Sequence, residues 1–168
     1  MKNKEIDRNN KVAENILDSN LWGVEILRDN LLNDILGQDN HDILYWAGKN
    51  LSLKFPVQTE SLPTFFAKSK FGNLELIKHS EIKSTVSLSG EIIERRLKND
   101  KDADFALETG YIAQTIQQNT GFETEAEYNI KRKKTVEINV VSDVSKQIFN
   151  PEIVNPLPLN QTTDSETE

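Results

Sequence analysis

Two glycines inside helical segments constrain the fold of this chain more than any other feature. Gly48 lies in the middle of a segment from 40 to 55, and Gly110 lies in a second segment from 105 to 119, both with helical apolar spacing. A glycine in a helix interior costs roughly 1 kcal/mol relative to alanine. A close approach of two backbones, which the missing side chain permits, offsets that cost. We therefore predict that these two helices cross with Gly48 and Gly110 at their contact.

The apolar pattern elsewhere predicts two antiparallel hairpins among several helices. Alternation marks 73–89 as one hairpin and 122–140 as a second, with the basic run Lys131–Lys134 as its turn. Helical spacing marks the segments 21–36, 40–55, 61–71, 91–97 and 105–119. Hairpins and helices without strand–helix–strand alternation indicate an α+β domain. We expect a four-stranded antiparallel sheet that is covered on one face by helices.

The two ends of the chain differ in composition from its middle. The length of 168 residues is enough for one domain with a moderate core. The first ten residues are almost devoid of apolar side chains, and the last 26 contain three of the five prolines. We expect a disordered N-terminus over 1–18, a single domain over 19–142, and a disordered acidic tail over 143–168.

The charge of the chain argues against a nucleic-acid partner. The formal net charge is −7, and no basic stripe offers a footprint for a phosphate backbone. The short run Lys131–Lys134 is flanked by Glu127 and Glu137, and a solvated turn accounts for it better than a contact with a polyanion.

The absence of cysteine excludes several kinds of chemistry. Disulfides, thiolate nucleophiles and thiolate metal sites all need a residue that this chain does not contain. The sequence also has no run of 18 apolar residues and no apolar signal-peptide core. We therefore expect a cytoplasmic protein without a membrane span.

The residues that could carry catalysis are few and scattered. The two histidines, His41 and His79, belong to different segments, and neither stands at metal-ligand spacing from the other. Glu108 lies in an otherwise apolar helix, where burial could raise its pKa and make it a base. Structural pairing with Arg95 or Arg96 is the alternative. We expect no enzymatic activity, no cofactor and no metal ion.

Four blocks of sequence carry a resemblance to a known family. They are LGQDNHDILYWAGKNLSLKFP (36–56), SLPTFFAKSKFGNLELI (61–77), GEIIERRLKND (90–100) and FALETGYIAQTIQ (105–117). In this order and spacing they resemble the YslB family of low-GC Gram-positive bacteria, over residues 21 to 141. That family is a domain of unknown function, so the resemblance implies a fold without naming an activity.

The two glycine-containing helices also resemble a wider superfamily, that of 4-vinyl reductases and TRAPP small subunits. The matches to its helix motif L-Y-x-A-G-x-x-x-G are Leu44, Tyr45, Ala47 and Gly48, with Ser52 at the last glycine. Gly110 matches the shared glycine of a second motif, C-x-x-x-x-G-x-x-x-G, whose cysteine is absent here. The resemblance implies a NO-signalling/Golgi-transport ligand-binding-like fold and a tendency to dimerise. Because this chain lacks the cysteine, the resemblance does not imply that it binds a metal or an acyl chain through that residue.

The first of two non-catalytic functions is that of a homodimeric interaction or adaptor protein with an unknown protein partner. Helix 40–55 is apolar on two sides, with Gly48 on one stripe and Trp46 at the centre of the other. The first stripe would pack inside the domain, and a second copy would press on the Trp46 side. The apolar, proline-containing segment 149–159 is a candidate docking segment, with a plain linker as the alternative.

The alternative function is that of a binding module for a small hydrophobic ligand, in a pocket between the helices and the sheet. The aromatic residues that could serve as ligand-binding or interface residues are Tyr45, Trp46, Phe65, Phe66 and Tyr111. Aromatic side chains also fill cores, and simple burial is the competing explanation for them.

Overall fold

The computed structural model describes residues 21–132, 134–150 and 155–159. The predicted disordered N-terminus over 1–18 lies outside these residues, as do 151–154 and 160–168 of the predicted tail.

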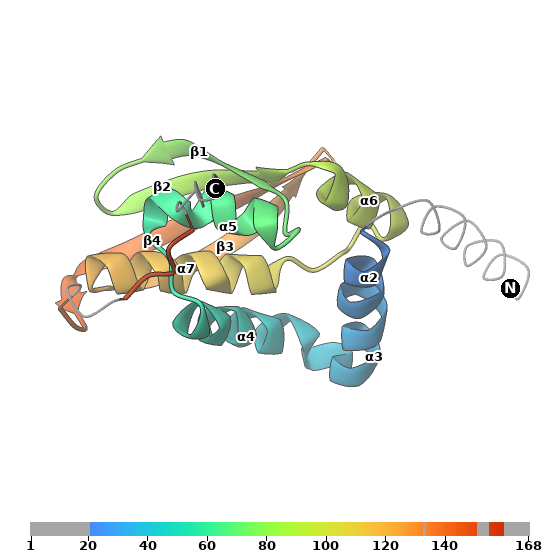
Figure 1. The fold of residues 1–168 in the computed structure, drawn as a ribbon, viewed down its shortest axis with the longest axis horizontal. Coiled ribbons are helices and arrows are strands. Elements are labelled where there is room, and N and C mark those ends of the chain that lie inside the picture. Colours follow the sequence, from blue (N-terminus) through green and yellow to red (C-terminus); the bar gives the residue numbers. More distant parts are fainter. Residues whose placement is uncertain (1–20, 133, 151–154, 160–168) are drawn as a thin grey trace, which may run out of the picture.

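Four strands form one antiparallel sheet in the order β1-β2-β4-β3 (Figure 1). The strands are β1 (Asn73–His79), β2 (Lys83–Ser89), β3 (Phe122–Lys131) and β4 (Thr135–Gln147). Each hairpin is antiparallel, and the two hairpins join through β2 and β4, where Val86 lies opposite Ile138. The predicted α+β class and the four-stranded antiparallel sheet built from two hairpins are therefore confirmed.

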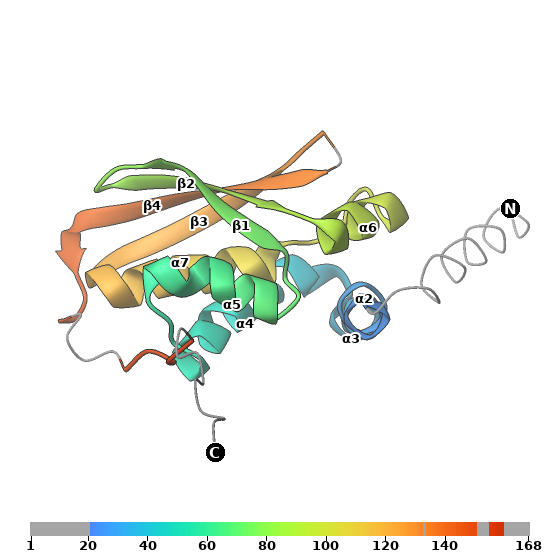
Figure 2. The same ribbon diagram turned by 45° about the horizontal axis from the view of Figure 1, so that its top comes forward.

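The helices lie on one side of this sheet in two layers (Figures 1 and 2). They are α4 (Asn40–Lys54), α5 (Leu62–Lys68) and α7 (Ala106–Thr120), whereas α6 (Glu91–Asn99) lies beyond the end of β2. Helix α7 packs on the sheet, and α4 lies on the outer side of α7. Helix α4 ends at Lys54, two residues before Pro56, because a proline cannot continue the hydrogen-bond ladder.

A further helix precedes α4 and contains a π-helical turn. Its parts are α2 (Trp22–Glu25), η1 (Ile26–Leu31) and α3 (Leu32–Leu36), and the 3-10 turn η2 (Gly37–Asp39) links it to α4. A second 3-10 turn, η3 (Thr59–Ser61), precedes α5. The helix predicted over 21–36 is present, and we refer to it below as helix 22–36.

The core lies between the sheet and the helices and is closed by aromatic rings. Phe65 and Tyr111 stack with their ring centroids 4.4 Å apart, and Phe66 meets Tyr111 edge-on. The hydroxyl of Tyr111 donates a hydrogen bond to the Phe55 carbonyl at 2.7 Å, so its one polar atom is satisfied. The sheet contributes the buried side chains of Val86, Leu88, Val136, Ile138 and Val140.

Helices α4 and α7 cross at Gly48 and Gly110, and their backbones touch there. A Cβ atom on Gly48 would lie 2.1 Å from the Leu107 carbonyl oxygen, and one on Gly110 would lie 2.0 Å from the Tyr45 carbonyl oxygen. Both obstacles are backbone atoms, which cannot move aside without shifting a helix. Only glycine therefore fits at either position.

Each edge of the sheet carries a local feature that hinders pairing with another chain. On β3, the backbone of Thr124 receives a hydrogen bond from Lys49 and donates one to Gln117, and the Ala126 N–H donates to the Tyr45 hydroxyl. On β1, the register shifts between Leu76 and Lys78, which is a β-bulge. Capped backbone groups and edge bulges are two of the devices that block edge-to-edge association.

The ordered domain extends further than the predicted boundary at residue 142. Strand β4 continues to Gln147, which pairs with Phe122, and the Ile148 N–H donates to the Gly121 carbonyl at 2.7 Å. The predicted disorder over 143–147 is wrong because backbone pairing with β3 orders this mostly polar stretch. Further along, Leu157 donates its N–H to the Pro56 carbonyl at 2.7 Å and packs against the core.

Substitution of Gly110 by alanine tests the helix crossing. In an open helix this change stabilises by about 1 kcal/mol, but here the new Cβ atom meets the Tyr45 carbonyl oxygen. We expect Gly110→Ala to lower the free energy of unfolding by at least about 2 kcal/mol, as overpacking does. The measurement is urea unfolding followed by circular dichroism. Gly23→Ala is the matched control, because nothing lies within 4 Å of a Cβ atom there, and it should be neutral or stabilising.

Candidate functional site

Helix α4 presents three different sides, and each of them positions candidate residues. The inner side contacts α7 through Leu44, Gly48 and Ser52, whose hydroxyl is 2.9 Å from that of Thr115. A second side reaches the edge strand β3 through Tyr45 and Lys49. The third side faces outward and carries Trp46. The residues Tyr45 and Trp46, adjacent in sequence, therefore belong to different surfaces.

Tyr45 and Lys49 are fixed in place by strand β3. The Tyr45 hydroxyl donates to the Glu125 carboxylate and accepts a hydrogen bond from the Ala126 N–H at 3.1 Å. The Lys49 ammonium donates to Glu125 at 2.6 Å and to the Thr124 carbonyl at 3.3 Å. Burial raises the pKa of Tyr45, and the Glu125 carboxylate raises it further. The phenol therefore stays protonated and serves as a hydrogen-bonding link between α4 and the sheet.

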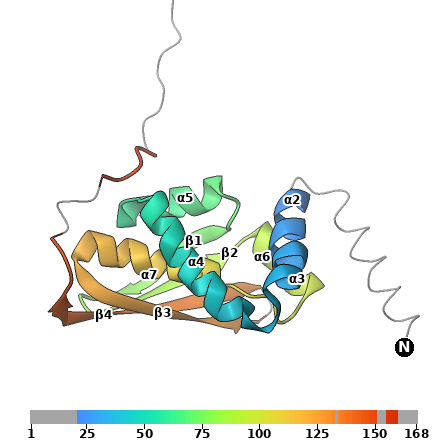
Figure 3. The same cartoon turned by 90° about the horizontal axis from the view of Figure 1, so that it is seen from below.

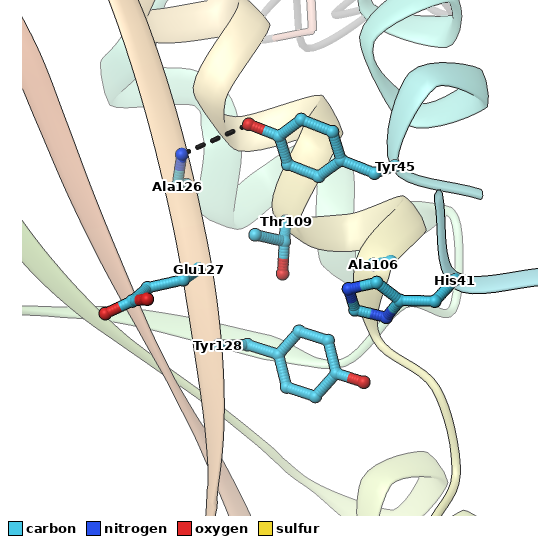
Figure 4. Close-up of a pocket in the computed structure, with 7 residues that line it drawn as sticks. All are labelled: His41, Tyr45, Ala106, Thr109, Ala126, Glu127 and Tyr128. Carbon is cyan, nitrogen blue, oxygen red and sulfur yellow. Dashed lines mark hydrogen bonds between the residues drawn. The ribbon is translucent and has the colours of Figure 1, made fainter. Parts of the chain in front are cut away.

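A small crevice of about 310 Å³ lies between α4, α7 and β3. Its walls are His41, Tyr45, Ala106, Thr109, Ala126, Glu127 and Tyr128. Figure 4 shows Tyr45 and Tyr128 on opposite sides of Thr109, with His41 beside them. The Asp104 carboxylate holds two of these side chains, since it lies 2.7 Å from His41 Nδ1 and accepts from the Tyr128 hydroxyl at 3.2 Å.

Two of the groups that line this crevice, Tyr128 and Thr109, are not suited to proton transfer or nucleophilic attack. Burial, followed by the nearby Asp104 charge, raises the pKa of Tyr128 to about 12. The Thr109 hydroxyl donates to the Phe105 carbonyl at 2.8 Å, so the threonine is engaged within its own helix. Neither group is poised as a base or a nucleophile near neutral pH.

The outer side of α4 carries an exposed apolar row, which we call the α4 stripe. It consists of Ile43, Trp46, Asn50 and Leu53, and its three apolar members are 43%, 61% and 56% exposed. The Lys49 ammonium lies 5.2 Å from the centroid of the Trp46 ring, a cation–π distance. Lys49, three residues further along the same helix, thus helps to hold the Trp46 ring in its exposed position. Figure 3 shows α4 lying outermost on this side of the molecule.

A larger, mostly apolar pocket of about 560 Å³ lies between α5, α7 and the β1–β2 hairpin. Its apolar walls are Leu62, Pro63, Leu74, Leu76, Val86 and Ile116. At its rim His79 lies 2.9 Å from the Ser84 hydroxyl. None of these aliphatic residues was singled out from the sequence, because each fits an ordinary strand or helix face. Residue spacing within one helix or strand cannot predict this pocket, because five separate segments of the chain line it.

The three remaining aromatic candidates, Phe65, Phe66 and Tyr111, lie in the core. They contact one another and are buried, and none of them lines the crevice or the larger pocket. Simple burial accounts for their positions.

Glu108 is the fully buried centre of an ion-pair network. Both of its carboxylate oxygens accept hydrogen bonds from Arg28, at 2.8 and 3.0 Å, and Arg96 approaches at 3.3 Å. Burial alone would raise the pKa of Glu108, but the two guanidinium groups outweigh it and hold the pKa below its ordinary value. The hypothesis of a base with a raised pKa is therefore wrong. The predicted structural pairing holds for Arg96, whereas Arg95 pairs with Glu25 at 2.8 Å.

Two negative findings apply to the described residues. Within them, no three or more histidine, aspartate or glutamate side chains are gathered as a metal ion would require. None of the described helices combines the length and the apolar character needed to cross a bilayer.

Comparison with known proteins identifies relatives of this chain. Residues 21–141 match the family model described as "Protein of unknown function (DUF2507)". The chain is also 39% identical to the "Uncharacterized protein YslB" of Bacillus subtilis (strain 168) over 102 residues, which cover 60% of this chain and 69% of that protein.

Replacement of Glu108 by glutamine tests the buried network. At pH 7 we expect Glu108→Gln to lower the free energy of unfolding by about 3–5 kcal/mol, because Arg28 loses its carboxylate partner. The folded-state pKa of Glu108 is depressed, so its contribution is present above the unfolded value of about 4.3 and is lost as the pH falls below it.

The difference in the free energy of unfolding between the parent chain and Glu108→Gln should therefore narrow as the pH falls from 5 towards 3. Urea unfolding at each pH measures this difference. The exposed Glu127→Gln is the matched control and should stay within about 0.5 kcal/mol of the parent at pH 7. A stability difference that stays constant down to pH 3 would contradict the pairing.

Proposed function

We propose that this chain, which belongs to the DUF2507 family, is a non-catalytic, cytoplasmic interaction protein. In this proposal it works as a homodimer whose two copies meet through the α4 stripe. The observation that carries this proposal is an exposed tryptophan between two exposed aliphatic residues, on a helix whose opposite face is locked against α7.

The α4 stripe has the spacing of a helix–helix contact. Ile43, Trp46, Asn50 and Leu53 follow one another at intervals of three, four and three residues, which is the spacing of an a/d seam. A polar residue such as Asn50 in an apolar seam sets the register of pairing at some cost in stability. The stripe thus has both the apolar content and the specificity element of an association surface.

The stripe is also complementary to itself. When two copies of α4 pack antiparallel about a two-fold axis at position 48, Ile43 lies opposite the partner's Leu53 and Trp46 lies opposite the partner's Asn50. The same contacts occur twice by symmetry, because a two-fold axis makes each contact of one copy with its partner reciprocal. This complementarity selects a second copy of the chain as the occupant.

Two further points support a non-catalytic, dimeric protein. The buried acid Glu108 is held ionised by arginines and does not serve as a base. The resemblance of the glycine-containing helices to the 4-vinyl reductase and TRAPP small-subunit superfamily implies a ligand-binding-like fold with a tendency to dimerise.

The second candidate function is binding of a small hydrophobic ligand in the pocket between α5, α7 and the β1–β2 hairpin. Its volume of about 560 Å³ lies in the range of small-molecule sites. An apolar lining with a few polar groups at the rim, among them His79 and Ser84, is the usual composition of such sites.

A charge in the α4 stripe tests the dimer. We expect the parent chain to have the mass of a dimer by size-exclusion chromatography with light scattering at micromolar concentration. Trp46→Glu should raise the dissociation constant at least a hundredfold and yield monomers, because it places two carboxylates in an apolar contact. The control Ile77→Glu alters a similarly exposed residue on β1 and should remain dimeric. A monomeric parent, or a dimer that survives Trp46→Glu, would contradict the proposal.

Two neighbouring residues of β1 offer a matched test of the ligand pocket. Leu76 lines the pocket and Ile77 does not, although both are about half exposed. We expect the fluorescent apolar probe N-phenyl-1-naphthylamine to bind the parent chain. Leu76→Glu should weaken its binding at least tenfold, and Ile77→Glu should leave it unchanged. The pocket has no such role if the probe does not bind, or if both variants behave alike.

A further inference from the structure

Helix 22–36 is inverted relative to an ordinary surface helix. Its buried side is polar, with Glu25 only 2% exposed and Arg28 only 8% exposed. Its exposed side is apolar and consists of Trp22, Ile26, Leu27, Leu31 and Ile35, which are between 37% and 67% exposed. An exposed apolar patch on one element marks an interaction surface. We call this side the outer face of helix 22–36.

Three ion pairs hold the helix in this orientation. Glu25 pairs with Arg95 at 2.8 Å, Arg28 pairs with Glu108 at 2.8 Å, and Asp29 pairs with Arg96 at 2.8 Å. A roll of the helix that buried Leu27 and Leu31 would leave the buried Glu108 without Arg28. The π-helical turn from Ile26 to Leu31 lies at the centre of this arrangement, and such turns occur frequently at functional sites.

The exposed charged residues from residue 21 to the first turn of α4 are all acidic. Between residues 21 and 53 the only lysine or arginine side chains are Arg28 and Lys49, and both are buried. The exposed charged residues of the same stretch are Asp34, Asp39 and Asp42. The outer face therefore combines apolar contact area with an acidic rim. An anionic membrane surface is repelled by such a rim, and so is a second copy of the same face.

We infer that the outer face of helix 22–36 docks a basic amphipathic helix of another protein. An apolar stripe flanked by lysine or arginine matches both properties of the face: the apolar sides pack together, and the basic flanks meet the acidic rim. The surface differs from the α4 stripe, so this inference stands apart from the proposed homodimer and gives the interaction protein a second, heterologous contact.

The two tryptophans of the chain make the test specific for one face. Trp22 lies on the outer face of helix 22–36, and Trp46 lies in the α4 stripe. The probe is a 15-residue peptide of leucine and lysine with heptad spacing, and its control replaces every lysine by glutamate. In Trp46→Phe, which leaves Trp22 as the reporter, we expect the lysine peptide to shift the emission to shorter wavelength with saturation. In Trp22→Phe, which leaves Trp46, we expect no shift.

Paired substitutions then locate the contact. The double variant Leu27→Gln, Leu31→Gln should weaken binding of the lysine peptide at least tenfold, and the matched double variant Ile43→Gln, Leu53→Gln on α4 should leave it unchanged. Absence of binding, equal binding of both peptides, or equal effects of the two double variants would overturn the inference. So would sedimentation of the chain with phosphatidylcholine–phosphatidylglycerol vesicles that is lost in Leu27→Gln, Leu31→Gln.

Discussion

The backbone contact between α4 and α7 at Gly48 and Gly110 is the constraint on which the rest of the structure depends. Since neither position has room for a Cβ atom, α4 lies directly against the backbone of α7. At that separation Tyr45 and Lys49 reach past α7 to the edge of β3, where they hydrogen-bond to Ala126 and Thr124. The contact also fixes the rotation of α4 about its own axis. In that orientation the Trp46 side chain lies exposed on the surface of the domain.

A second constraint acts on α7 at Glu108, two residues before Gly110. The buried carboxylate of Glu108 on α7 requires its two arginine partners, because an unpaired buried charge is strongly destabilising. Arg28 supplies one of them from helix 22–36, so the polar side of that helix must face inward. Its apolar residues are exposed as a consequence. Two packing requirements, one steric and one electrostatic, therefore create two separate exposed apolar surfaces on one small domain.

Local patterns predicted most of the fold, and the reason is physical. The two hairpins, the long helices and the positions of Gly48 and Gly110 follow from periodicities and backbone rules that act over a few residues. The orientation of helix 22–36 could not be predicted in this way. Its apolar spacing fits a helix, but the pairing of Arg28 with Glu108 joins residues 80 positions apart and overrides that pattern. The end of β4 was missed for a similar reason, since pairing with β3 orders a mostly polar stretch. The aromatic residues were the natural candidates for a pocket, yet three of them close the core and aliphatic side chains line the larger cavity.

Cross-linking between copies of the chain tests most directly the claim that α4, anchored at Gly48, presents a self-complementary surface. The sequence contains no cysteine, so a single introduced thiol reports one position without background. The account predicts that Asn50→Cys, treated with a short bismaleimide, runs at twice the monomer mass on a denaturing gel, whereas Ile77→Cys on β1 does not. No cross-link at position 50, or equal cross-linking at both positions, would contradict it.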